Sequence, residues 1–208
     1  MELSDLPVRS FFELLGSNAA APGGGSAVAM AASLGAALAE MVSALTVTRS
    51  QYAEFHEEAQ AGMESSAALR TAFLAAMERD TEAFRRYTAA ASLPRETEEE
   101  KTLRTAAIRE ALILCIESPL HLMGLSLDAV KLVERMVGKT NPAAVSDLGV
   151  AALMLGAAVQ SAWLNVLINL GSLKDEAQSA AYRLRGEGLL RETLAHSQAV
   201  YDQVLDLL

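Results

Sequence analysis

The feature that most constrains this sequence is a long run without charge. No charged residue occurs between Asp147 and Lys174, and a second uncharged run extends from Ala27 to Ala39. The first run is long enough to cross a bilayer as a helix, whereas the second is too short. A chain with such segments must either place them in a membrane or bury them in a helical core.

Polar side chains inside the longer run favour the core. Ser161, Asn165, Asn169 and Ser172 recur at three- and four-residue spacing, so they share one helix face. Polar groups gathered on one face need polar partners. In the shorter run, the many Ala and Gly residues suit close contacts between helices. Both runs are therefore predicted to be core helices, and no membrane partner is expected.

The composition predicts an all-helical protein that does not bind nucleic acid. Hydrophobic residues make up 51% of the 208 residues but aromatic residues only 5%, so the apolar content is mostly Ala, Leu, Val and Met, which favour helices over sheets. The net charge of −9 provides no basic face to neutralise a phosphate backbone. The length fits one core, and we expect a single domain over residues 1–208.

Cysteine and histidine usage argue against disulfide and metal chemistry. Cys115 is the only cysteine, and the three histidines show no spacing typical of a zinc site. Met1 is followed by acidic and polar residues rather than by the apolar core of a signal peptide. We therefore expect a cytoplasmic protein without a metal.

Periodicity and capping signals predict an all-α, up-and-down bundle of long helices. Thr97 and Glu100 have the spacing of a capping box, Pro119 predicts a break or kink, and Gly186 and Gly188 are possible interruptions. The expected helices are Pro7–Leu15, Ser26 (as N-cap) to about Leu45, Ser50 to about Ala91, Thr97–Ile116, Leu120–Val137, Asp147–Leu170 and Asp175 to the C-terminus.

Three features exceed what core packing requires. The first is the PGGGS sequence at Pro22–Ser26. Consecutive glycines before a helix leave backbone N–H groups uncovered at its positive end, where a carboxylate or phosphate can dock. Flexible glycines before a capped helix are also common, so a purely structural interpretation remains open.

The second feature is Asp80, which occupies an apolar position in the series Phe73, Met77, Asp80, Phe84 and Tyr87. Burial would raise the pKa of its carboxyl and suit it to proton transfer near neutral pH. The alternative is that Asp80 forms an ion pair with an arginine.

The third feature is a set of polar side chains on or before the long uncharged helix: Asn165 and Asn169, with Asn141 and Asp147 upstream. A buried amide without a partner costs about 1–3 kcal/mol, so something polar must face these groups. A heterocycle with several donors and acceptors, a dimer interface or buried water would each meet that need.

Together these residues carry a family resemblance. The sequence contains AAPGGGSA, DTEAFRRY, LPRETEEEKTLR, SPL at Ser118, NPAAVSDLGVAA and NVLINLGSLKDEA, in that order. In this set the chain resembles the cyclodeaminase domain of formiminotransferase-cyclodeaminase and the related stand-alone methenyltetrahydrofolate cyclohydrolases. The resemblance runs nearly end to end.

The resemblance implies a homodimer that binds a tetrahydrofolate derivative in a groove between subunits, with no further cofactor. Asp80 matches the family's catalytic aspartate. Gly24, Gly25 and Ser26 match its glycine turn, and the polar positions expected to line the groove are Asn141, Asp147, Asn165 and Asn169.

The implied activity is that of a methenyltetrahydrofolate cyclohydrolase, which hydrolyses the one-carbon bridge to give 10-formyltetrahydrofolate. We favour it because the chain carries no formiminotransferase domain. The alternative activity is that of a formiminotetrahydrofolate cyclodeaminase, which releases ammonia. A non-catalytic helical dimer that serves as a scaffold is an alternative of another class.

Overall fold

The protein is an all-α bundle, as predicted. The computed structural model describes residues 2–208, and within that range it contains helices but no strands. A short helix, α1 (Val8–Leu15), precedes the bundle. The long helices are α2 (Gly24–Val47), α3 (His56–Ala91), α4 (Glu98–Met136), α5 (Val145–Leu170) and α6 (Glu176–Leu207).

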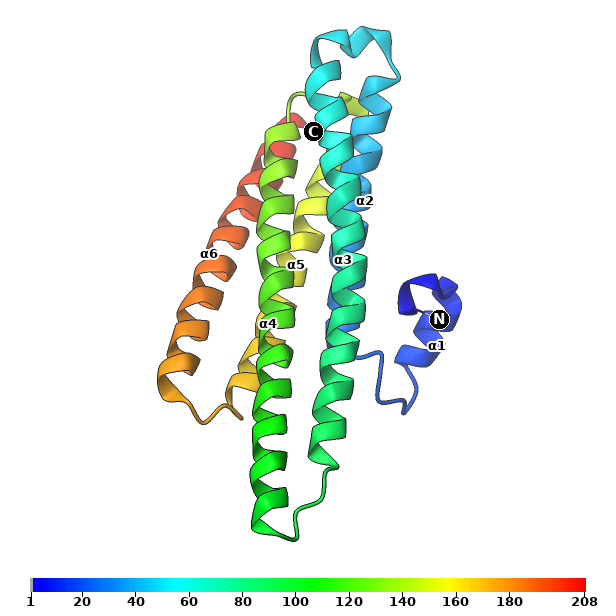
Figure 1. Cartoon of the computed structure of the whole chain (residues 1–208). Coiled ribbons are helices and arrows are strands. Elements are labelled where there is room, and N and C mark those ends of the chain that lie inside the picture. Colours follow the sequence, from blue (N-terminus) through cyan, green and yellow to red (C-terminus); the bar gives the residue numbers. More distant parts are fainter. Residues whose placement is uncertain (1) are drawn as a thin grey trace.

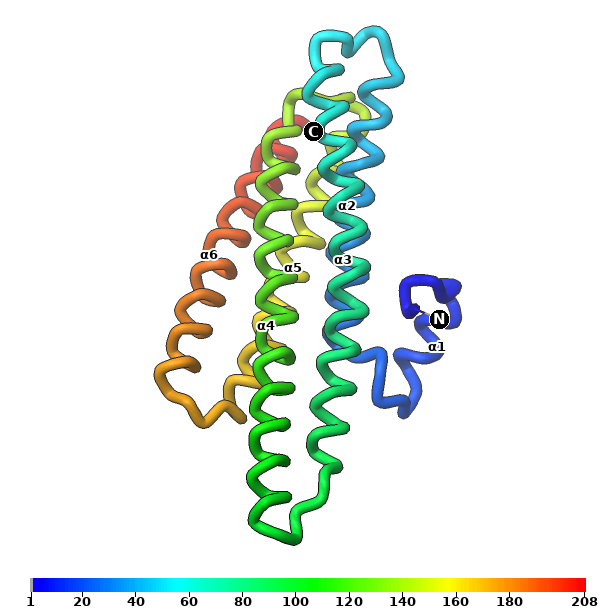
Figure 2. The backbone as a smooth tube through the Cα atoms, in the orientation of Figure 1, coloured from blue at the N-terminus to red at the C-terminus, as the bar shows by residue number. Residues whose placement is uncertain are grey.

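Consecutive long helices run up and down (Figure 1). The helices α2, α3, α4 and α5 each pack against two neighbours and close into a four-helix ring, while α6 packs against α4 and α5. The tube in Figure 2 shows α1 standing beside the bundle, on the side of α2 and α3. The segment before α1 is tied to α3 by the Ser4 backbone N–H, which donates to Glu78 Oε1 at 3.1 Å.

The two uncharged runs lie against each other in the core. At Gly35, an added Cβ would lie 3.1 Å from the Ala151 carbonyl oxygen, so small residues bring α2 and α5 together. Three stretches, Gly24–Val47, Glu98–Met136 and Pro142–Leu170, are long and apolar enough to cross a membrane, and 50%, 50% and 56% of their most apolar windows are buried inside the bundle. About half of each apolar window is therefore buried in the core of the bundle.

Several predicted helix boundaries are confirmed, and others are wrong. The capping box forms, with the Glu100 N–H donating to Thr97 Oγ1 at 3.1 Å. Ser26 is not an N-cap, because α2 already begins at Gly24 and Ser26 is buried in its first turn. Pro119 does not divide its helix, and α4 runs through it as one element. The last helix is likewise uninterrupted at Gly186 and Gly188.

The two glycines of α6 differ in their surroundings, and this difference makes a test of the packing. A Cβ added at Gly186 would overlap the Trp163 ring on α5, whereas one added at Gly188 would meet nothing within 4 Å. We expect Gly186→Ala to lower the free energy of unfolding by about 1–3 kcal/mol through overpacking. The control Gly188→Ala should raise it by about 0.5–1 kcal/mol, because alanine favours the helix. Urea unfolding followed by circular dichroism measures both, and equal effects would contradict the packing.

Candidate active site

A pocket of about 350 Å³ opens where the N-terminal end of α2 meets α3, α4 and α5. It contains the Asp80 carboxyl, the glycine turn and two amides of α5. The residues that line it are Ala20, Ala21, Gly23, Gly24, Gly25, Ser26, Asp80, Thr81, Phe84, Tyr87, Leu112, Cys115, Asn165, Ile168, Asn169 and Ser172. Six of the eight predicted site residues therefore meet in one place.

Asp80 is the titratable group at the centre of this pocket. Burial raises the pKa of its carboxyl above the usual range of an aspartate. No opposing charge or hydrogen bond within residues 2–208 counteracts this effect. The ion pair with Arg79 or Arg85, which was the alternative for this position, does not form there. The proton affinity of Asp80 thus suits proton transfer nearer to neutral pH.

The backbone of α2 passes directly beside this carboxyl. A Cβ added at Gly25 would overlap all three atoms of the Asp80 carboxyl group, whereas one added at Gly24 would lie 3.5 Å from Asn165 Oδ1, an ordinary contact. Gly25 is therefore required by space rather than by backbone conformation. The glycines are predicted to bind an anion, but the group beside Gly25 is the protein's own carboxyl.

The amides of α5 face the pocket from the opposite wall. Asn169 Nδ2 donates to the Cys115 carbonyl oxygen on α4 at 3.0 Å and to the Asn165 carbonyl oxygen at 2.8 Å. The Asn165 side chain lies beside Gly24 and also lines a small cavity behind Asp80. The predicted polar stripe is thus real, and its last three residues, Asn165, Asn169 and Ser172, line the pocket.

Aromatic and aliphatic side chains form the rest of the wall. Phe73 and Met77 are fully buried, as the apolar series predicts, but Phe84 is 41% exposed and Tyr87 is half-buried, and both line the pocket. Expecting Phe84 in the core was wrong, whereas Tyr87 does pack partly against the core. The signal available in the sequence was their spacing of four and seven residues from Asp80, which puts them on its helix face.

Cys115 lines the same pocket but is not a nucleophile. Burial, and secondarily the negative charge of Asp80, raises the pKa of its thiol to about 11. The thiol therefore stays protonated at neutral pH, and covalent catalysis by a thiolate is disfavoured.

Asn141 and Asp147 are not part of this pocket. Asp147 and Asn165 are 18 residues apart on α5, which corresponds to about 27 Å along the helix. Asn141 is buried, its backbone N–H donates to Thr46 Oγ1 at 2.9 Å, and its Oδ1 accepts from Tyr52 at 3.0 Å. Within one chain Asn141 anchors the turn before α5, and its place in a groove between subunits stays a prediction.

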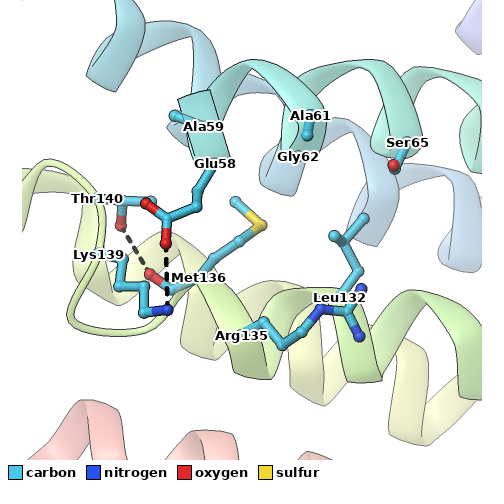
Figure 3. Close-up of a pocket in the computed structure, with 10 residues that line it drawn as sticks. All are labelled: Glu58, Ala59, Ala61, Gly62, Ser65, Leu132, Arg135, Met136, Lys139 and Thr140. Atoms are coloured by element: carbon cyan, nitrogen blue, oxygen red, sulfur yellow. Dashed lines mark hydrogen bonds and ion pairs between the residues drawn. The ribbon is translucent and has the colours of Figure 1, made fainter. Parts of the chain in front are cut away.

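A second pocket, of about 230 Å³, lies at the far end of the α3–α4 pair (Figure 3). Figure 3 shows Glu58 of α3 reaching toward Lys139, and the two form an ion pair at 3.4 Å. The Met136 side chain lies between the two helices. Glu58 and Lys139 are paired with each other and more than half exposed, so this hollow has no buried, unpaired carboxyl like that of Asp80.

The described part of the chain offers no cluster of metal ligands. Across the described residues 2–208, no group of three or more His, Cys, Asp or Glu side chains is placed to hold an ion. On the wall of the Asp80 pocket, the Cys115 thiol is close enough for the Asp80 charge to raise its pKa.

Comparison with known proteins identifies the family. The family model described as formiminotransferase-cyclodeaminase matches residues 7–187. The chain belongs to this family. The predicted resemblance is confirmed.

Relatives of two kinds are similar over almost the whole chain. A methenyltetrahydrofolate cyclohydrolase from Methylorubrum extorquens is 36% identical over 197 residues, which cover 95% of each protein. A formimidoyltransferase-cyclodeaminase from Sus scrofa is 35% identical over 198 residues, which cover 95% of this chain but 37% of that protein. A crystal structure of formiminotetrahydrofolate cyclodeaminase from Thermotoga maritima superposes with a TM-score of 0.83 at 25% identity and covers 100% of this chain and 98% of that one.

The burial of Asp80 predicts a stability effect that is independent of any substrate. Because the pKa of Asp80 is raised in the folded state, the native protein loses stability as pH rises from the unfolded pKa through the folded one. We expect Asp80→Asn, which carries no charge, to raise Tm near neutral pH by about 2–4 °C. The difference should shrink as pH falls toward about 3.9, the ordinary aspartate pKa. A lower Tm for Asp80→Asn at neutral pH would contradict the burial.

Proposed function

We propose that this protein is a methenyltetrahydrofolate cyclohydrolase, which converts methenyltetrahydrofolate and water into 10-formyltetrahydrofolate. The observation that carries the proposal is the unpaired Asp80 carboxyl with its raised pKa in a largely apolar pocket. Support also comes from the similarity over 95% of both chains to a relative that bears this name.

Asp80 acts twice in the proposed reaction. Its carboxylate stabilises the cationic amidinium of the substrate and accepts a proton as water adds to the bridging carbon. The resulting carboxylic acid then protonates N5, the bond between N5 and the carbon breaks, and loss of the remaining hydroxyl proton leaves a formyl group on N10. One proton is released overall, and Asp80 returns to its ionised form.

The other walls suit a folate. Phe84, Tyr87 and Ile168 provide flat and apolar surface for the ring system. The amides of Asn165 and Asn169 provide hydrogen-bonding groups for a heterocycle rich in donors and acceptors.

Cyclodeaminase activity on 5-formiminotetrahydrofolate is the alternative, because attack of N10 and loss of ammonia need the same proton transfer at the same place. It is favoured by the similarity to the Thermotoga maritima protein, which is comparable in length to this chain. The bifunctional relatives are much longer, and this chain spans 37% of the Sus scrofa protein. A non-catalytic helical scaffold is the third possibility, and the Asp80 site argues against it.

A pair of assays separates these activities. Purified protein is given methenyltetrahydrofolate in one experiment and 5-formiminotetrahydrofolate in another, and loss of the methenyl absorbance and release of ammonia are measured. We expect turnover of the first substrate. Ammonia release from the second without turnover of the first would favour the cyclodeaminase, and no turnover of either would favour the scaffold.

Variants at the contact between α2 and α3 test the role of Asp80. Asp80→Asn should lower kcat by about 10²–10⁴-fold, because the amide cannot exchange the proton. Gly25→Ala should also lower kcat strongly, since the added Cβ displaces the carboxyl, while Gly188→Ala on α6, where a Cβ would meet nothing within 4 Å, serves as the control with unchanged kcat. Unchanged turnover in Asp80→Asn would remove Asp80 from the mechanism.

We further propose that the protein is a cytoplasmic homodimer that pairs through the outer face of α2 and α5. This α2–α5 face carries exposed or half-exposed apolar residues, namely Ala27, Ala31, Leu34, Met41, Val150, Leu153, Ala157, Leu164 and Ile168. The one charged residue of α2, Glu40, is engaged with Arg70 of α3 at 2.8 Å. A second copy would cover apolar surface that the core leaves open, without a membrane.

The face is continuous with the site, because Gly24 and Asn165 line both the Asp80 pocket and a groove on the α2–α5 face. In a two-fold dimer with antiparallel α5 helices, the N-terminal end of one α5 lies beside the C-terminal end of the other. We propose that Asp147 of the partner subunit approaches the pocket in this way. Burial of the face also brings the folate site into the groove between subunits.

Charge on the face should separate the subunits. Leu164 is 67% exposed on α5, and Leu184 is 75% exposed on α6, outside the proposed interface. We expect Leu164→Glu to yield a monomer by light scattering and to lose most activity, because a desolvated carboxylate is costly in an interface. Leu184→Glu should remain dimeric and active. A wild-type protein that is monomeric at micromolar concentration would refute the interface.

A further inference from the structure

The motif SPL, which the proposed chemistry does not use, places a proline inside a long helix. Pro119 lies within α4 and is buried. A proline has no backbone N–H, and its ring crowds the carbonyl four residues earlier. That carbonyl belongs to Cys115, which therefore has no intrahelical donor from position 119.

The Cys115 carbonyl oxygen receives a donor from another helix instead. Asn169 Nδ2 on α5 donates to it at 3.0 Å, and the same nitrogen donates to the Asn165 carbonyl oxygen at 2.8 Å. Both partners are carbonyl oxygens, which only accept hydrogen bonds, so the NH₂ group of Asn169 must face them. The amide orientation of Asn169 is thereby fixed, and neither contact uses its Oδ1.

Pro119 lies outside the substrate pocket itself. Asn169 and Cys115 line that pocket, whereas Pro119 lines only a cavity of about 10 Å³ behind Asp80, together with Gly25 and Asn165. Pro119 therefore reaches a ligand only through the residues that it orients.

We infer that Pro119 is a positioning residue. Because it leaves the Cys115 carbonyl free, that carbonyl accepts from Asn169 Nδ2 and fixes the orientation of the Asn169 amide. Asn169 Oδ1 then faces the pocket as an acceptor for a ring N–H of the bound folate. This inference rests on the proposed function for the identity of the ligand. With alanine at position 119, the added backbone N–H competes for the Cys115 carbonyl oxygen, and one of the two fixed contacts of Asn169 weakens.

A double-mutant cycle tests the coupling through substrate binding. Pro119→Ala and Asn169→Ala should each raise KM by about tenfold, the loss expected for one oriented hydrogen bond, with kcat changed much less. In the double variant, KM should equal that of Asn169→Ala alone, because Pro119 acts through Asn169. The exposed loop residue Pro94 provides the control, and Pro94→Ala should leave KM unchanged. Effects that multiply in the double variant, or a Pro119→Ala enzyme with wild-type KM, would overturn the inference.

A second measurement does not depend on turnover or on the folding of Pro119→Ala. In the wild-type protein without ligand, the side-chain NH₂ signal of Asn169, assigned by its loss in Asn169→Ala, should exchange slowly with water. Rapid exchange typical of a free surface amide would overturn the inference even if the enzyme is active. Slow exchange together with absent turnover of both folates would support the lock while refuting the proposed function.

Discussion

The site depends on the close approach of a helix backbone to a carboxyl group. At Gly25 the main chain of α2 lies so near Asp80 of α3 that a side chain of any size would overlap the carboxyl. This approach keeps water away from one side of Asp80, and no cation within residues 2–208 compensates. The raised proton affinity of Asp80 is therefore a property of how two helices meet, and the glycine turn and the early start of α2 both serve that contact.

The uncharged helix α5 serves three environments at once. One face packs in the core, with Leu155 and Val159 fully buried. A second presents Asn165 and Asn169 to the pocket, and a third carries Leu164 on the outside. A charged residue on any of these faces would be desolvated, either in the core, beside Asp80 or in the proposed interface. Little of the α5 surface is thus left in contact with water. This explains why the helix carries no charge over a length typical of a membrane segment.

The sequence predicted the fold well because helix periodicity and capping are local. The capping box at Thr97 and the apolar stripe at Phe73 and Met77 were correct for this reason. Periodicity also placed Asp80 correctly, since it identifies residues on one face. It does not say how far along the bundle a residue lies, which is why Asp147 was grouped with Asn165 although about 27 Å of helix separates them.

Other details depend on contacts between helices that no local pattern encodes. Ser26 has the character of an N-cap, but α2 starts at Gly24 and places Gly25 beside Asp80. Phe84 continues the apolar series of α3, yet it lines the Asp80 pocket instead of packing in the core. Pro119 predicts a break, but an amide from α5 takes the carbonyl that the proline leaves free, and α4 continues.

The most direct test of this account is a titration of the Asp80 carboxyl itself. Protein labelled with ¹³C at the aspartate side chains can be followed by NMR across pH, with Asp80→Asn used to assign the signal. The account predicts that Asp80 in the free protein titrates clearly above about 3.9, the value of an unperturbed aspartate. A pKa at or below that value would show a solvated or ion-paired carboxyl, and the proposed catalytic role would then have no physical basis.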